Sequence, residues 1–444
     1  MNHLSKKEIM FVSFMLFSMF FGAGNLIFPP FLGQAAGNHV WLSLTGFILS
    51  AAGLPILGVM AVAKAGGFRT LAERVHPAFA FLFPLLVYLS IGPGLAIPRA
   101  GSLAYEMGAA PFLPAGLTAN PTVTALYTFV FFCLVFWLSL SPSKLVDRFS
   151  KLLTPLLLAM IAVIFIKSFF TPMDALKSPE GNYGPNPAFQ GFLDGYLTMD
   201  ALAALAFGIV IANTLKAKGL NEEKSLSRYM IYAGLGAGLL LAVIYLILGY
   251  LGAVTPNAAQ AENGAQVLTL MMHHLFGAGG TILLGFTFTI ACLCVSVGLV
   301  TSCSQFFSAS LPKLSYKAWA TVLTVWSMAI ANLGLTQILN VSVPILGLLY
   351  PIAITLIILA LSHRYVAAYP SVYPLAVTLV GLFSILDTIN NILFTGKFSS
   401  AFAHLPLYAA GFGWIAPAFI GVLAGCMVDI IKGVRHSTAK KDAA

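Results

Sequence analysis

Residues 19–30 read MFFGAGNLIFPP and lie in the middle of an apolar run that extends over residues 9–36. Inside a helix, Gly costs about 1 kcal/mol and Pro about 3 kcal/mol relative to Ala, so this stretch predicts an interrupted helix. An interruption leaves carbonyl groups of the first half-helix and N–H groups of the second without partners. The carbonyls suit a cation or an ammonium group, and the N–H groups suit a carboxylate. The stretch indicates either a site that holds both ends of a zwitterion or a kinked helix packed through its glycines.

The composition is that of a membrane protein. Of 444 residues, 59% are hydrophobic and 8% are charged, against about 25% charged in a soluble domain, and the mean hydropathy is +0.92. Lipid cannot pair open backbone N–H and C=O groups, so long apolar runs are expected to cross the bilayer as helices. We predict an all-α polytopic membrane protein with twelve transmembrane helices, near residues 9–36, 40–62, 77–106, 121–140, 150–171, 188–214, 228–254, 278–308, 317–334, 338–361, 371–393 and 408–431.

The basic residues indicate the orientation. All but four of the 23 lysines and arginines fall in the N-terminal segment, in the loops after even-numbered spans or in the C-terminal tail; the exceptions are Lys167, Lys177, Lys397 and Arg99. Because Lys and Arg are enriched in cytoplasmic loops, both termini are predicted to be cytoplasmic. The net charge of +9 is spread over short loops, so no nucleic-acid partner is expected. The segment 255–277 is predicted to be a longer loop with a short surface helix.

Two consecutive units of five spans must run in opposite directions across the bilayer, because five is odd. We therefore predict an inverted repeat, with residues 1–171 as the first unit (spans 1 to 5), 172–362 as the second (spans 6 to 10), and 363–444 as the last two spans and the tail. The first and sixth spans then correspond, and interruptions at corresponding positions point to a transport site. The sixth span reads GFLDGYLTMDA over residues 191–201.

Charged residues within the spans are costly, by at least about 2.5 kcal/mol each. Asp194 lies near the outer end of the sixth span, where it is either solvated or part of a site. Asp200 lies deeper and either faces a substrate amine or a cation, or caps the second half-helix. Arg99 and Glu106 share a face of the third span, about two turns apart. We interpret them as a water-facing vestibule pair, with Arg99 as the anchor of an acidic substrate as the alternative.

The eighth span carries Gly298, Thr301 and Ser302. Hydroxyl groups in membrane helices commonly bond to a carbonyl of the preceding turn. Alternatively, the Gly298 carbonyl and the two hydroxyls supply oxygen ligands to a small hard cation such as Na⁺.

The stretch 20–30 resembles the first span of the branched-chain amino acid:cation symporters (LIVCS family, BrnQ type), and length and span number agree over the whole chain. The resemblance implies a LeuT-like fold of five plus five inverted spans and two extra helices, with the first and sixth helices discontinuous. It implies import of leucine, isoleucine and valine across the bacterial cytoplasmic membrane, coupled to Na⁺.

Carried over by position, the resemblance implies two groups of site residues. The backbone N–H groups of Ala23 and Gly24 face the substrate carboxylate. Phe20 and Thr198 face the amine or a first cation, and Asn25 supplies a side-chain oxygen. The remaining implied substrate contacts are Gly22, Tyr88, Tyr196, Leu197 and Asp200, with Tyr88 either on the carboxylate or bonded within the bundle. The implied Na⁺ ligands are the carbonyls of Ser18, Phe21 and Gly298 and the hydroxyls of Thr301 and Ser302.

The sixth span departs from the class at Asp200, where relatives often carry a small polar residue, so Na⁺ and H⁺ both remain open as coupling ions. A proton-coupled carrier of other small neutral amino acids is the alternative function. A membrane-embedded enzyme would need a reactive cluster, and Asp194 with Asp200 is the only close pair of carboxylates within a span. A channel is a further alternative, although no filter motif is present. We expect no catalytic residue, no organic cofactor, a small amino acid as the partner besides the lipid bilayer, and a monomer.

Overall fold

The computed structural model describes residues 5–118, 120–140, 144–217, 223–258, 261–394 and 396–433. Throughout these residues the regular structure is helical, and no strand is present in them. The basic C-terminal tail, with Arg435, Lys440 and Lys441, lies outside the described residues. Within the described residues, seven helical segments are long and apolar enough to cross a membrane, and they are Ala23–Ala65, Pro77–Phe112, Pro121–Leu140, Arg228–Val254, Gly264–Ser310, Leu335–Leu361 and Val372–Leu393.

Two helices make up the first predicted span. Helix α1 (Lys6–Phe20) starts at a capping box, in which Ser5 and Glu8 bond each other's backbone N–H. This arrangement satisfies N–H groups that the first turn of a helix leaves open. Helix α2 (Ala23–Ala36) follows after a two-residue link. The 3₁₀ turn η1 (Gly37–His39) then reverses the chain.

The second and third predicted spans contain wide helical turns. Helices α3 (Val40–Ile48) and α4 (Leu54–Ala65) join through the π-helical turn η2 (Leu49–Gly53). Helices α6 (Pro77–Leu89) and α7 (Ala96–Gly108) join through η3 (Ser90–Gly94). In η3, Gly92 is non-helical with φ −102° and ψ −121°, and Pro93 has no N–H to donate. The third span is therefore bent at its middle, which sequence patterns did not predict.

The remaining helices follow the predicted order. The predicted loop 255–277 already contains the start of helix α14, and the non-helical Gly277 separates this start from the eighth span. Its Leu268, Met271 and Leu275 are buried, so this part packs into the protein and is not a surface helix.

The other elements are α5 (Phe68–Glu73), η4 (Ala110–Phe112), α8 (Ala115–Thr118), α9 (Pro121–Leu140), α10 (Lys144–Ser168), η5 (Gly181–Tyr183), α11 (Pro187–Asp194), η6 (Gly195–Thr198), α12 (Asp200–Ala217), α13 (Glu223–Val254), α14 (Gly264–Ser310), α15 (Tyr316–Ala331), α16 (Leu335–Leu361), α17 (His363–Val366), α18 (Val372–Leu393), α19 (Ser399–Phe402), η8 (Tyr408–Ala410) and α20 (Ile415–Ile431).

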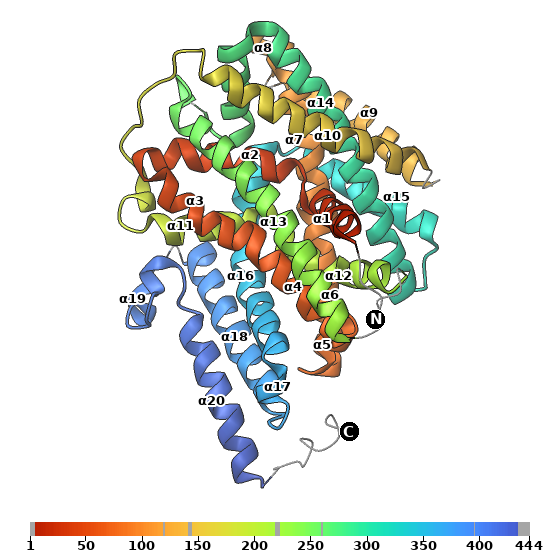
Figure 1. The fold of residues 1–444 in the computed structure, drawn as a ribbon, viewed down its shortest axis with the longest axis vertical. Helices are drawn as coiled ribbons and strands as arrows, with labels where there is room; N and C mark the ends of the chain where they lie inside the picture. The colour runs from red at the N-terminus through yellow and green to blue at the C-terminus, as the bar shows by residue number, and fades with distance from the viewer. Residues whose placement is uncertain are drawn as a thin grey trace.

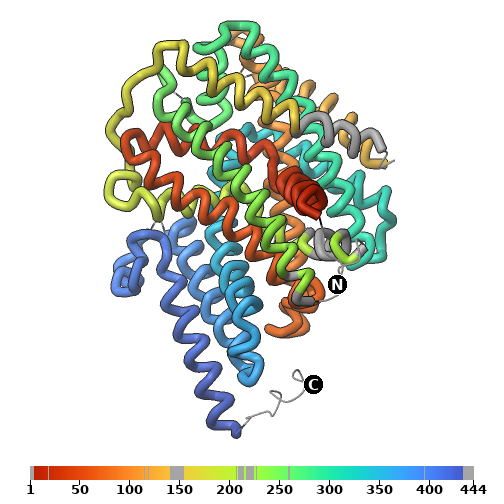
Figure 2. The backbone as a smooth tube through the Cα atoms, in the orientation of Figure 1, coloured from red at the N-terminus to blue at the C-terminus, as the bar shows by residue number. Residues whose placement is uncertain are grey.

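Helix packing brings the first and sixth spans to the centre. Helices α1 and α2 pack against α13, α11 packs against α3, and α12 packs against α4. Figure 1 shows α13 crossing the first span, and Figure 2 shows the same crossing as a green tube over a red one. Helix α18 packs against both α16 and α20, and Figure 1 shows these three helices in the lower part of the view.

Glycines permit the closest of these contacts. A Cβ built on Gly33 of α2 would overlap the carbonyl of Gly249 of α13, and one on Gly252 would overlap Pro30. A Cβ on Gly46 of α3 would overlap Ala188 of α11, and one on Gly191 would overlap Ser43. In a bilayer, small residues favour association because they let helix backbones approach closely. These glycines therefore position the first and sixth spans beside their partner helices.

Candidate functional site

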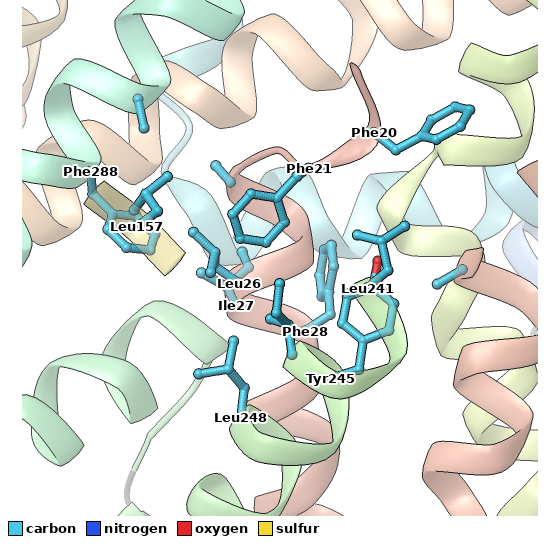
Figure 3. Close-up of a cluster of buried hydrophobic side chains, with 14 of the residues drawn as sticks. Phe20, Phe21, Leu26, Ile27, Phe28, Leu157, Leu241, Tyr245, Leu248 and Phe288 are labelled. Carbon is cyan, nitrogen blue, oxygen red and sulfur yellow. The ribbon is translucent and has the colours of Figure 1, made fainter. Parts of the chain in front are cut away.

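The link between α1 and α2 opens the first span. Phe21 (φ −75°, ψ 89°) ends α1, and Gly22 (φ −114°, ψ −177°) is extended and precedes α2. The first N–H groups of a helix have no acceptor within it, and those of Ala23 and Gly24 lie in the first turn of α2. Figure 3 shows Phe21 above Leu26 and Ile27 in a cluster of buried apolar side chains, and the Phe20 ring pointing away from Phe21.

The sixth span is opened by a similar interruption. Helix α11 ends at Asp194, the 3₁₀ turn η6 follows, and Met199 adopts φ 62° before α12 begins at Asp200. A left-handed conformation costs a non-glycine residue about 1–2 kcal/mol, and surrounding packing must hold it. The Thr198 hydroxyl donates to the carbonyl of Gly195 (2.9 Å) and accepts from the Asp200 N–H (3.4 Å). Both spans thus present helix ends at the level where they meet.

A buried hydrogen-bond network joins the two interruptions. The Asn25 amide donates to Asp200 Oδ2 (2.6 Å) and to the Tyr245 hydroxyl of α13 (2.6 Å). The Asn25 side-chain oxygen accepts the Gly22 N–H (3.1 Å). Asn25, Asp200 and Tyr245 are all buried, and a buried polar group must be hydrogen-bonded to offset its loss of water. The Asn25 side chain therefore fixes the α2 start against both α12 and α13.

Arg99 of α7 reaches the same place. Its side chain is only 7% exposed, and Nη1 donates to the carbonyl of Leu197 at 2.6 Å. The guanidinium lies over the Phe28 ring, 5.2 Å from its centroid. Arg99 and Asp200 line the same cavity. A buried charge requires hydrogen bonds and favourable contacts, which the Leu197 carbonyl and the Phe28 ring supply to Arg99.

A cavity of about 130 Å³ lies between these groups. Polar and backbone atoms of the two interruptions form one side of the cavity, and aliphatic side chains of η3, α7 and α14 form much of the rest. We call it the central cavity. It is lined by Ser18, Phe20, Phe21, Gly22, Ala23, Gly24, Asn25, Ile91, Ala96, Arg99, Ala100, Leu103, Thr198, Met199, Asp200, Ala203, Val295 and Leu299.

Most substrate residues implied by the sequence meet at this cavity, namely Phe20, Gly22, Ala23, Gly24, Asn25, Thr198 and Asp200. Tyr196 and Leu197 instead line a separate outer cavity. Tyr88 does not line the central cavity, because its hydroxyl donates to the carbonyl of Ala206 (3.3 Å) and its ring stacks on Phe306 (3.8 Å between centroids).

The implied Na⁺ ligands divide between two places. Ser18 and Phe21 line the central cavity; the Ser18 hydroxyl itself donates to Met15 O at 2.8 Å. Gly298, Thr301 and Ser302 of α14 do not line this cavity, whose α14 wall is Val295 and Leu299. Within the described part of the chain, no group of three or more His, Cys, Asp or Glu side chains is placed to hold a metal.

The predicted vestibule pair of Arg99 and Glu106 is not formed. Glu106 accepts hydrogen bonds from Asn263 (3.0 Å) and Gln266 (2.9 Å), whereas Arg99 turns inward to Leu197. Both residues lie on α7, about two turns apart, and each side chain reaches a different partner along that helix. An arginine within an apolar span is costly in free energy, and this cost was the sequence feature that indicated a functional role for Arg99. For Tyr245, no sequence signal distinguished the residue from other tyrosines.

Comparisons with known proteins match the whole chain. A family profile described as "Branched-chain amino acid transport protein" matches residues 5–432. The chain belongs to this family. It is 45% identical to the branched-chain amino acid permease BraB of Bacillus subtilis, over 98% of each chain. It is 41% identical to the branched-chain amino acid transport system 2 carrier protein of Pseudomonas aeruginosa, again over 98% of each.

Solved structures with similar folds are LeuT-like transporters. An inward-facing structure of Mhp1 matches with a TM-score of 0.63 at 14% identity, covering 95% of this chain and 91% of that one. MhsT in complex with L-phenylalanine matches with a TM-score of 0.53 at 15% identity, covering 96% and 98%. The family is thus one of membrane transporters with this fold.

Proposed function

We propose that this chain is a symporter that imports leucine, isoleucine and valine by alternating access, with Na⁺ as the coupling ion. The observation that carries the proposal is the central cavity, where the Arg99 and Asp200 side chains and apolar walls meet at two helix interruptions. The family and the named permeases support the substrate class.

The substrate carboxylate binds at the start of α2. The N–H groups of Ala23 and Gly24 and the positive end of the helix dipole favour an anion there, and the Arg99 guanidinium adjoins the same turn, since a Cβ on Gly24 would lie 3.0 Å from Arg99 Nη2. Arginine binds carboxylates through paired hydrogen bonds. Arg99 is therefore the residue that this proposal adds to the carboxylate site.

The ammonium group binds at the other charge, near Asp200 and the carbonyl groups of Phe20 and Thr198. The aliphatic side chain lies among Ile91, Leu103, Val295 and Leu299, which line the cavity. An apolar pocket discriminates by one methylene group with only about 1–3 kcal/mol. Leucine, isoleucine and valine are accordingly expected to share the site.

The coupling cation binds between the end of α1 and α14, on the carbonyls of Ser18, Phe21 and Gly298 and the hydroxyls of Thr301 and Ser302. Because the α14 ligands lie outside the central cavity wall, this site is completed when α1 and α14 approach. Ion binding then favours one of the two access states, as coupling requires. Asn25 and Thr198 are the proposed ligands of a second cation beside the substrate.

Proton coupling is the second candidate, and Asp200 is the observation that favours it. This buried carboxylate accepts a hydrogen bond from Asn25 and lines the substrate cavity, so it can carry a proton with the substrate. In that case, other small neutral amino acids are the alternative substrates.

The proposal also includes the architecture of the chain. It has twelve spans, discontinuous first and sixth helices, and the repeat units 1–171 and 172–362. Exchange of the units maps the first span onto the sixth and the second onto the seventh. The contact of α2 with α13 is then equivalent to that of α12 with α4, and the contact of α11 with α3 is equivalent to that of α1 with α13. We propose a monomer in the bacterial cytoplasmic membrane with both termini in the cytoplasm.

Leucine uptake into proteoliposomes tests the proposal. One charge moving through 100 mV contributes about 2.3 kcal/mol, which at about 1.4 kcal/mol per tenfold supports roughly fifty-fold accumulation. We expect radiolabelled leucine to accumulate under an inward Na⁺ gradient and to stop accumulating when choline replaces Na⁺. Accumulation that continues in choline and depends on a proton gradient would favour the second candidate.

The Arg99→Gln variant tests the carboxylate site. Loss of the guanidinium is expected to raise the KM for leucine by about tenfold or more, because a charged hydrogen bond contributes about 1.5–3 kcal/mol. Arg69→Gln is the matched control, since the Arg69 side chain is exposed and pairs with Glu73 on its own helix. Equal KM values for the two variants would remove Arg99 from the site.

A further inference from the structure

A tyrosine of α13 lies one side chain away from the central cavity. Tyr245 is 0% exposed, and it does not line the cavity. Its hydroxyl accepts a hydrogen bond from the Asn25 amide at 2.6 Å, and Asn25 does line the cavity. Tyr245 therefore reaches the proposed substrate site through the side chain of Asn25.

The packing of α13 holds the Tyr245 ring in place. The ring meets Phe47 of α3 edge to face, with centroids 5.0 Å apart and planes at 86°. Figure 3 shows Tyr245 in the cluster of buried side chains that includes Phe28. About one helical turn after Tyr245, the Gly249 carbonyl lies so close to α2 that a Cβ on Gly33 would overlap it. The hydroxyl is therefore fixed relative to α2.

The Asn25 side chain uses both of its N–H groups. One donates to Asp200 Oδ2 of α12 (2.6 Å), and the other donates to the Tyr245 hydroxyl (2.6 Å). The side-chain oxygen accepts the Gly22 N–H (3.1 Å). A carboxamide has two donor hydrogens, so acceptors on two different helices set the orientation of its plane.

Without the Tyr245 hydroxyl, one Asn25 N–H would be buried without this acceptor. A buried donor that loses its partner is costly, so the Asn25 side chain is expected to turn away from its present orientation. This turn would break the hydrogen bond to Asp200 and release the Gly22 N–H. Asp200 and Gly22 both line the central cavity, so the change would reach the site itself.

We infer that Tyr245 is a positioning residue for leucine binding. Its hydroxyl holds Asn25, and Asn25 holds the Asp200 carboxylate toward the substrate ammonium group and the Gly22 turn in its extended form. The inference rests on the proposed function for the identity of the substrate. Because Tyr245 belongs to α13, the site at the two interruptions is complete only while α13 stays packed on α2.

Tyr245→Phe tests the inference, because it removes the hydroxyl and retains the ring that packs on Phe47. In initial-rate uptake by proteoliposomes, we expect the KM for radiolabelled leucine to rise about tenfold. The maximal rate is expected to stay within about twofold of the wild type, because a binding interaction is lost. Tyr250→Phe is the matched control, since Tyr250 lies on the same helix, stacks on Trp41 and does not line the cavity.

A double-mutant cycle tests whether Tyr245 acts through Asn25. Asn25→Ala removes both amide N–H groups, so Tyr245→Phe is expected to change the KM no further in this background. If uptake by Asn25→Ala is too slow to give a KM, Asn25→Ser replaces it as the background. A serine has a single hydroxyl donor, which cannot bond to Asp200 and Tyr245 together.

A wild-type KM in Tyr245→Phe would overturn the inference, as would a rise that Tyr250→Phe matches or that recurs in full in the Asn25 background. A Tyr245→Phe protein that does not fold, or that has a lower thermal midpoint with a wild-type KM, would assign the hydroxyl to the fold alone and also overturn it. Sodium-dependent leucine uptake by the wild type tests the proposed function separately. Its absence overturns that function, whereas normal wild-type uptake with an unchanged KM in Tyr245→Phe overturns only the role of Tyr245.

Discussion

Gly24 is the residue at which the site and the fold depend on each other most closely. A Cβ at this position would lie 3.0 Å from Arg99 Nη2 and 3.2 Å from Phe28 Cε2. Such distances are tight, so one of the neighbours would have to move. The Phe28 ring is buried beneath the guanidinium, and the Arg99 end is the more mobile of the two groups. Glycine at this position therefore lets the guanidinium lie against the start of α2.

Gly24→Ala is accordingly expected to displace the guanidinium and weaken leucine binding. We expect the KM for uptake to rise by about five- to thirtyfold, equivalent to about 1–2 kcal/mol, with protein folding preserved. Gly279→Ala is the control, because Gly279 is a glycine of α14 whose Cβ would meet no described atom within 4 Å. Initial rates of radiolabelled leucine uptake measure both. An unchanged KM in Gly24→Ala would show that Arg99 need not adjoin this turn.

At the scale of helices, a polar cluster joins segments on the predicted cytoplasmic side. Arg74, which follows α5, donates to the Tyr373 hydroxyl of α18 at 3.1 Å. The same hydroxyl donates to the Leu359 carbonyl of α16 (2.9 Å) and lies 3.2 Å from His363 Nδ1. Partial burial, followed by the positive charge of Arg74, lowers the pKa of His363 below its ordinary value of 6.5. The cluster thus holds a neutral histidine next to a cation.

The lowered pKa predicts a loss of stability in acid. The folded protein binds a proton at His363 less readily than the unfolded chain, so its stabilisation is complete above the ordinary pKa and declines as the pH falls through the lowered value. We expect the thermal midpoint of the purified protein to fall between about pH 7 and pH 5, and His363→Gln to reduce this fall. His404→Gln, at an exposed position in the 396–414 loop, is the control. Identical pH profiles for wild type and His363→Gln would refute the assignment.

At the scale of the whole molecule, seven segments of the described chain are apolar and long enough to span a bilayer, and α1, α10, α12, α15 and α20 contribute the remaining predicted spans. The exposed surface is rich in large apolar side chains, such as Phe419, Leu423 and Met427 of α20. A soluble protein rarely exposes such contiguous apolar faces. Lipid is the environment in which this surface is stable.

The proposed orientation predicts the accessibility of single cysteines. In a variant without the five native cysteines, Cys at Lys177 or Lys397 is expected to react with a membrane-impermeant maleimide on intact cells. Cys at Lys64 or Lys313 is expected to react only after the membrane is opened. Because Lys177 and Lys64 are separated by an odd number of proposed spans, the opposite pattern at either position would contradict the topology.

The sequence predicted the class of protein better than it predicted the site. The helical membrane architecture and the family were predicted correctly, and the helix ends at Phe20, Gly22 and Met199 lie where Gly-rich and Asp-containing stretches indicated. The predicted water-facing pair of Arg99 and Glu106 was wrong, because Arg99 is buried and bonds to Leu197, whereas Glu106 bonds to Asn263 and Gln266. The roles of the cation ligands on α14 stay predictions.

Composition and local pattern were sufficient for the lipid environment, the helical backbone and the weak points in the first and sixth spans, since each depends on residues within a few turns of one another. The pairing of Asn25 with Tyr245, 220 positions away, and of Arg99 with Leu197, 98 positions away, required the packing of distant helices. The cavity lined by Tyr196 and Leu197 also depends on the packing, because α11, α16 and α18 each supply only part of its wall. Local sequence preferences determine where a helix ends. The packing of all the helices determines which distant side chains come into contact.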